Sequence, residues 1–218
     1  MKFALINPNS NPTTTQEMCA IAMPYLGATP WGWTATDGPQ MITTPVALHA
    51  AAQQVAQAEL PADMRAVIVA AFGDPGAEAL ARRLPCPVVG IGAAAARAAA
   101  EDGAPFAVAT TTPMLSQSIT EAMTRHAPKG RYIGTFISDA DPQSLMSDDA
   151  ALDAALLEQV RFAAAQGAQR VIIGGGPLGR AATRLAPISP VPLINPIIAA
   201  CNELSDQFGL PLTPPVVT

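Results

Sequence analysis

Residues 66–76 read Ala-Val-Ile-Val-Ala-Ala-Phe-Gly-Asp-Pro-Gly, an apolar run that breaks into a glycine-containing turn. The same arrangement returns at residues 171–179, which read Val-Ile-Ile-Gly-Gly-Gly-Pro-Leu-Gly. Short continuous apolar runs bounded by glycine and proline are typical of buried strands in parallel sheets. A helical pattern follows each turn, as expected where a crossover helix joins two parallel strands. The repeated unit therefore predicts a duplicated α/β lobe.

Flanking segments extend the duplication in both directions. Upstream, the apolar runs 3–6 and 106–109 each lead into a polar, proline-containing loop, and each precedes its glycine-containing turn at a similar interval. That interval is too long for a solenoid repeat. Downstream, both turns lead through a short helix into proline-flanked strands at 87–90 and 192–194. We predict an α/β fold of two pseudo-twofold-related lobes, each a small parallel β-sheet flanked by helices.

The chain order of these segments predicts how the lobes are divided. Residues 1–92 and a C-terminal helix at 195–209 form the first lobe, and residues 93–194 form the second. In open parallel sheets, ligands bind outside the carboxyl ends of the strands, where loops and helix N-termini converge. We therefore expect a small-molecule site in the cleft where the loops after Ala71 and Gly175 meet.

Composition and charge exclude several classes of partner. The 218 residues are 50% hydrophobic and only 13% charged, which favours a globular fold over disorder. The net charge of −5 and the lack of a Lys/Arg run argue against nucleic acid. No apolar stretch approaches the roughly 20 residues of a membrane span, and the first apolar run is too short for a secretory signal. We expect a cytoplasmic protein without a membrane partner.

The cysteines give no sign of a metal site or a disulfide framework. Cys19, Cys86 and Cys201 are an odd set without CxxC or histidine-rich spacing. We expect each to be a buried, unreactive thiol, and we expect no metal ion.

The two polar loops after the first strand of each lobe carry candidate binding groups. Asn7, Asn9 and Ser10 can hold a small anion or amide, because asparagine offers a donor and an acceptor together. An asparagine-proline turn that caps the next helix is the alternative reading. Thr111 and Thr112 occupy the equivalent loop, and their hydroxyls could bind a carboxylate or a ring carbonyl.

The glycine-containing turns carry the second set of candidates. Gly175 and Gly176 would let a substrate approach the backbone, where peptide N–H groups could stabilise an enolate. A tight turn that requires glycine is the alternative. Gly73 and Asp74 lie at a strand-to-helix turn, where aspartate is a common helix cap. In a dry cleft, however, the pKa of Asp74 would rise and the carboxylate could act as a general base.

Four motifs carry a family resemblance. They are residues 6–10 (Ile-Asn-Pro-Asn-Ser), 71–76, 87–92 (Pro-Val-Val-Gly-Ile-Gly) and the glycine-rich turn 174–179. Together they resemble the aspartate/glutamate/hydantoin racemase superfamily, most closely its hydantoin and allantoin racemase branch. The resemblance runs over nearly the whole chain.

The resemblance implies a cofactor-independent enzyme in which two cysteines flank the α-carbon of the substrate. One thiolate removes a proton and the other thiol delivers one to the opposite face. This chain has Ala71 and Gly175 at those two positions, and neither side chain carries a proton. We expect the fold to be kept and the chemistry to have changed.

Two hypotheses on function follow. The first is an isomerase that acts on a small carbonyl compound, such as a hydantoin, ureide, amino acid or related acid, through an enolate-like intermediate without cysteine chemistry. A decarboxylase or hydrolase on the same scaffold is a variant of it. The second is a catalytically inactive small-molecule binding or regulatory protein. Exchange of the α-proton in deuterated water discriminates them. The alanine-rich helices are compatible with a homo-oligomer, and the sequence does not decide the assembly state.

Overall fold

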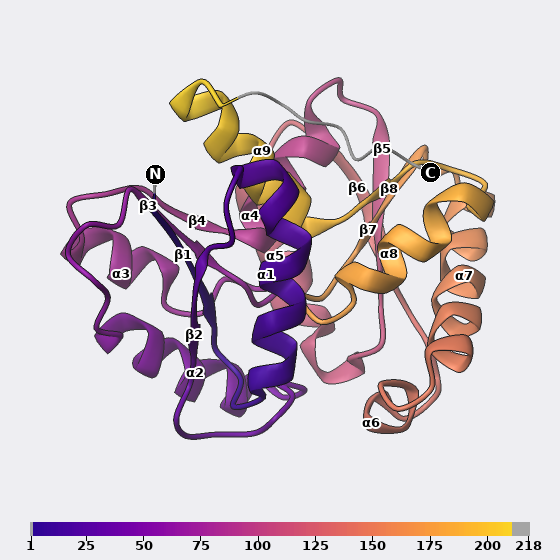
Figure 1. Ribbon diagram of the computed structural model, residues 1–218. Coiled ribbons are helices and arrows are strands. Elements are labelled where there is room, and N and C mark those ends of the chain that lie inside the picture. The colour runs from indigo at the N-terminus through magenta and orange to yellow at the C-terminus, as the bar shows by residue number, and fades with distance from the viewer. Residues whose placement is uncertain (1, 211–218) are drawn as a thin grey trace.

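The computed structural model describes residues 2–210 and contains two four-stranded parallel sheets (Figure 1). The first sheet has the order β2-β1-β3-β4, with β1 (Phe3–Asn7), β2 (Trp31–Thr34), β3 (Ala66–Val69) and β4 (Val88–Gly90). The second has the equivalent order β6-β5-β7-β8, with β5 (Pro105–Thr110), β6 (Arg131–Ile137), β7 (Arg170–Ile173) and β8 (Leu193–Ile194). The predicted duplication of a parallel α/β unit is therefore confirmed.

Helices alternate with the strands throughout. The first half contains α1 (Pro12–Leu26), α2 (Pro45–Gln57), α3 (Ala77–Arg83) and α4 (Ile91–Ala100). The second half contains the 3-10 turn η1 (Pro113–Leu115), α5 (Ser116–His126), α6 (Pro142–Leu145), α7 (Asp149–Ala165), α8 (Gly179–Leu185), the 3-10 turn η2 (Ala186–Ile188) and α9 (Pro196–Phe208). Within residues 2–210, no helix combines the length and apolar character that a bilayer crossing requires.

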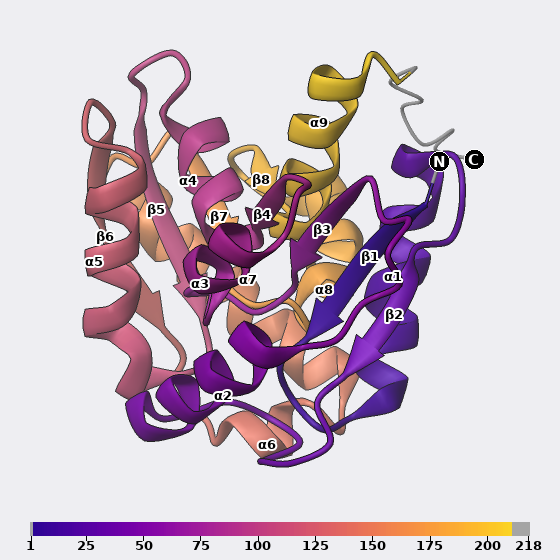
Figure 2. The same cartoon turned by 90° about the vertical axis from the view of Figure 1, so that its left-hand side faces the viewer.

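Two helices cross between the halves. The helix α4 follows the last strand of the first sheet but packs against α5, β5 and β7 of the second half. The helix α9 follows the last strand of the second sheet and packs against α1, β3 and β4 of the first half. Both lie between the two sheets and contact each other, as the two views show (Figures 1 and 2). The placement of α9 beside the first sheet agrees with the predicted lobe division, which stays a prediction as a statement about domains.

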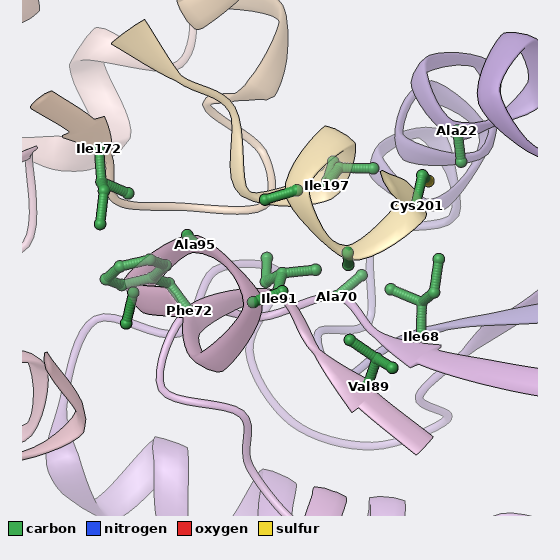
Figure 3. Close-up of a cluster of buried hydrophobic side chains, with 14 of the residues drawn as sticks. Ala22, Ile68, Ala70, Phe72, Val89, Ile91, Ala95, Ile172, Ile197 and Cys201 are labelled. Atoms are coloured by element: carbon green, nitrogen blue, oxygen red, sulfur yellow. The ribbon is translucent and has the colours of Figure 1, made fainter. Parts of the chain in front are cut away.

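One apolar core spans the interface between the lobes. It joins Leu5 and Ile68 of the first sheet to Phe106 and Ile172 of the second, through side chains of α4 and α9. Figure 3 shows part of this cluster, with residues of β3, β4, β7, α4 and α9 around a common centre. Burial of one such Leu, Ile or Phe side chain contributes about 1.5–3 kcal/mol. The shared core therefore fixes the carboxyl ends of both sheets relative to each other.

Candidate functional site

A small cavity of about 60 Å³ lies where the carboxyl ends of the two sheets meet. Both lobes line it. The first lobe contributes Asn9, Met41, Ile42, Ala70, Ala71 and Phe72, and the second contributes Thr110, Thr111, Thr112, Leu115, Ile119, Gly174, Gly175, Gly176, Pro177 and Leu178. None of these lining residues carries a charged side chain or an imidazole.

The loops after Ala71 and Gly175 meet at this cavity. Both residues line it, from opposite lobes. The loops also touch directly, because a Cβ atom built on Gly176 would overlap the carbonyl oxygen of Ala70. Glycine at 176 is therefore required by the close approach of two backbones. The lining also agrees with the expectation that strand ends of both lobes converge on one site.

The threonine loop supplies three buried hydroxyl groups to the cavity lining. The Thr110 hydroxyl already has hydrogen-bond partners within the protein. It donates to the Gly174 carbonyl oxygen at 2.8 Å and lies 3.3 Å from the Thr112 hydroxyl. Thr111 differs: its Oγ1 is completely buried and, within residues 2–210, has no hydrogen-bond partner. Leaving such a group unsatisfied costs about 1–3 kcal/mol. The Thr111 hydroxyl therefore has unused hydrogen-bonding capacity beside the cavity, and a rotation of its side chain would be needed to bring Oγ1 to a ligand there.

In the asparagine loop, Asn7 stabilises the loop and Asn9 lines the cavity. The Asn7 amide nitrogen, with two N–H donors, lies within hydrogen-bond distance of three acceptors: Asn9 Oδ1 at 2.8 Å, the Asn11 carbonyl oxygen at 3.0 Å and Thr15 Oγ1 at 2.9 Å. Asn7 is fully buried and is not part of the cavity lining, so it holds the loop in shape. Asn9 lines the cavity directly. Of the two predicted asparagines, only Asn9 can reach a ligand there.

Ser10 contacts the segment between β2 and α2 and does not line the cavity. Its hydroxyl donates to the Gly38 carbonyl oxygen at 2.9 Å, and its amide donates to the Pro39 carbonyl oxygen at 3.1 Å. These bonds hold the segment between β2 and α2, from which Met41 and Ile42 reach the cavity. Sequence reasoning missed both residues, because a loop without strand or helix periodicity gives no signal for the direction of its side chains.

Asp74 lies in the loop between β3 and α3, and its carboxylate contacts the first turn of α4. It has a left-handed backbone with φ of 53°, and its carboxylate accepts hydrogen bonds from the Gly92 amide at 2.7 Å and the Ala93 amide at 2.6 Å. Burial raises the pKa of Asp74 to about 6, against the lowering effect of those two amides. Asp74 and Gly73 line a separate hollow beside α2 and α3 and do not line the central cavity. Asp74 therefore caps α4 and not α3, the helix that follows its own turn and that, among the described residues, has no side-chain cap. Proton abstraction by Asp74 stays a prediction.

The three cysteines lie outside the cavity lining. All are free thiols; Cys19 and Cys201 are buried, and Cys86 is partly buried. Burial raises the pKa of Cys19 to about 11 and that of Cys201 to about 12, so both are protonated at neutral pH. In the described part of the chain, no three or more His, Cys, Asp and Glu side chains come together in a group that could hold a metal ion. No thiol therefore reaches the space between Ala71 and Gly175.

Comparison with known proteins identifies the family to which this chain belongs. A family model described as Asp/Glu/Hydantoin racemase matches residues 4–204. The chain belongs to this family. Among its relatives, the hydantoin racemase of Paenarthrobacter aurescens is 24% identical over 96% of this chain and 92% of the relative. The hydantoin racemase of Rhizobium meliloti is 27% identical over 96% and 89%, respectively. The family resemblance predicted from the four motifs is confirmed.

Solved structures show the same fold. The allantoin racemase of Pseudomonas fluorescens superimposes with a TM-score of 0.86 at 24% identity, covering 98% of this chain and 94% of that one. Glutamate racemase of Thermus thermophilus, in complex with β-chloro-D-alanine, gives a TM-score of 0.64 at 18% identity, with 98% and 83% covered. The higher score for the allantoin enzyme agrees with the hydantoin and allantoin branch of the family.

Proposed function

We propose that this protein is a cofactor-independent isomerase of the racemase family that binds a small carbonyl compound in the cavity between its lobes. Hydantoins, ureides, amino acids and related acids are the candidate ligands, and the reaction proceeds through an enolate-like form. The observation that carries the proposal is the buried, unpartnered hydroxyl of Thr111. Once rotation of the Thr111 side chain brings Oγ1 to the cavity surface, a carbonyl oxygen on a bound ligand would accept its hydrogen bond and remove the cost of leaving that group unsatisfied.

The lining also indicates how such a reaction would differ from two-thiol racemisation. The side chains of Ala71 and Gly175 carry no exchangeable proton, and the other lining residues offer no carboxylate, imidazole or thiol. Stabilisation of an enolate by preorganised hydrogen-bond donors needs no titratable group. The proton at the α-carbon would then leave to water and return from water. We therefore expect exchange that is slower than catalysis by a positioned acid and base.

The same lining favours a second candidate function. A cavity without a general base can bind a ligand without turning it over, so a catalytically inactive binding or regulatory protein is the alternative. Its ligands would be those of the enzyme, because the Thr111 hydroxyl and the apolar walls are the same. The two candidates differ only in whether the α-proton of the bound ligand exchanges.

Proton exchange and binding together test the proposal. A panel of 5-substituted hydantoins, ureides and amino acids is incubated with the protein in deuterated water, and α-deuteration is followed by NMR. We expect deuteration that the Thr111→Val protein loses. Saturable binding by calorimetry without deuteration identifies the binding protein instead. If no compound of the panel binds or exchanges, the proposal is wrong.

The cellular location and the assembly state are also proposals. We propose a cytoplasmic protein that forms a homo-oligomer, with small molecules as its ligands. Cell fractionation checks the location, and light scattering on the purified protein checks the assembly.

A further inference from the structure

In the turn at 174–176, a side chain at each of the three glycine positions would meet a different neighbour. A Cβ atom on Gly174 would lie 2.6 Å from Val108 Cγ1, inside the core, and one on Gly176 would overlap a backbone oxygen. Gly175 does not have a left-handed backbone, so its conformation suits any residue. The three atoms nearest to a Cβ at 175 all belong to Leu178: Cγ at 2.9 Å, Cδ1 at 3.0 Å and Cβ at 3.5 Å. A side chain at Gly175 therefore requires the Leu178 side chain to shift.

Leu178 is held firmly in that place. Its side chain is only 2% exposed and packs in a core cluster with Leu145, Ala181 and Leu185. Its amide donates to the Gly175 carbonyl oxygen at 3.2 Å, so the turn itself sets the position of its Cα atom. Leu178 also lines the central cavity. A side chain at 175 would therefore require a repacked core, since close-packed interiors accommodate added atoms only at a cost.

We propose that Leu178 is a specificity-determining residue of the cavity. Its side chain takes the volume that a side chain at position 175 would need, and it limits the size of the ligand group on the second-lobe side. The part of this inference that concerns ligands rests on the proposed function; the steric part does not.

The inference changes what is expected of a restored thiol pair. Ala71 already carries a Cβ atom, is partly exposed and lines the cavity, so cysteine at 71 adds only one sulfur atom to a lining side chain. Cysteine at 175 collides with Leu178. The A71C/G175C protein should therefore gain no racemase activity, whereas A71C/G175C/L178A, which lacks the obstructing side chain, should accommodate both thiols.

A stability cycle tests the steric part without any ligand. We expect Gly175→Cys to lower Tm by about 2–10 °C, the effect of overpacking in a chain of this size. Leu178→Ala also lowers Tm, because it leaves a void. The double variant should lose clearly less than the sum of the two. Leu185→Ala is the matched control. Leu185 is a buried leucine of the same cluster and supplies none of the three atoms nearest to a Cβ at 175, so its effect should add to that of Gly175→Cys.

Milder variants allow the stability cycle to be measured even if a larger substitution prevents folding. If Leu178→Ala does not fold, the cycle is repeated with Leu178→Val and Gly175→Ala, which make smaller changes at the same two positions. Additive losses for the 175 and 178 variants, or a Gly175→Cys protein as stable as the wild type, would overturn the steric assignment.

Ligand size tests the specificity part. We compare unsubstituted hydantoin with 5-benzylhydantoin by calorimetry and express the result as the ratio of their Kd values. In the Leu178→Ala protein this ratio should shift in favour of the bulky compound by at least about tenfold, the scale for added space in an apolar pocket. An unchanged ratio contradicts the specificity role. If neither compound binds either protein, the proposed function fails, and the stability cycle still decides the steric role of Leu178.

Discussion

The pH dependence of stability should reveal whether burial or hydrogen bonding dominates at Asp74. Its carboxylate accepts two short hydrogen bonds from the first turn of α4, and these favour the charged form. Burial opposes them and is the larger effect, so the pKa rises from 3.8 to about 6 in the folded protein. The change that tests this balance is Asp74→Asn, which keeps the size of the side chain and removes its titration.

The sign and size follow from linkage. Because the folded pKa lies above the unfolded value, the stabilisation from proton uptake is complete below about pH 3.8 and is lost as the pH rises through about 6. The full span is about 3 kcal/mol at roughly 1.4 kcal/mol per pKa unit. Only part of it falls between pH 7 and pH 5. In that window, the free energy of unfolding of the wild type should rise by about 1 kcal/mol relative to Asp74→Asn.

Urea unfolding at pH 5, 6 and 7 measures this difference. Groups that titrate in both proteins, such as His126, cancel when the variant is subtracted from the wild type. A difference that stays constant, or that shrinks as the pH falls, would refute the reasoning, because it would mean that the α4 amides outweigh burial. The same variant tests the general-base hypothesis: α-proton exchange that is unchanged in Asp74→Asn rules out Asp74 as the base.

Three further substitutions probe the cavity and its support. Thr111→Val should raise the free energy of unfolding by about 1–3 kcal/mol, since it removes an unsatisfied buried hydroxyl, and should weaken ligand binding by up to about tenfold; equal stability and affinity in both proteins would count against the site. Gly176→Ala should destabilise by about 1–3 kcal/mol in urea unfolding, because its Cβ meets the Ala70 carbonyl oxygen; a neutral effect would mean that the two loops are further apart. Asn7→Ala should lower the unfolding free energy by more than about 2 kcal/mol, because Thr15 and the loop backbone lose a buried partner; a loss of affinity without loss of stability would contradict its supporting role.

Much of the fold was predictable because buried parallel strands have a strong local signature. The runs at β1, β3, β5 and β7 are continuous and apolar, and all four end in glycine- or proline-containing loops. The edge strand β6 gave no such signal: it includes Gly134, mixes polar with apolar residues, and is mostly only partly buried. Contacts that place α4 beside the second sheet depend on tertiary packing, which local pattern does not encode.

The site was less predictable, because its parts differ in how far they depend on the rest of the fold. Thr111 and Thr112 follow a buried strand and line the cavity, as the position of their loop indicates. Asn7 and Asn9 are equally good candidates in sequence, yet one faces the loop interior and the other the cavity. The choice depends on where Thr15 lies, on the following helix. Leu178 was not recognised at all, since a leucine after a glycine turn is ordinary in sequence.

A crystal structure of the protein with a bound hydantoin tests the central claim most directly. The account predicts the ring in the cavity between Ala71 and Gly175, with a carbonyl oxygen within hydrogen-bond distance of Thr111 Oγ1 and one side of the ring against Leu178. A ring bound in the hollow beside Asp74, or one that leaves the Thr111 hydroxyl without a partner, would contradict it.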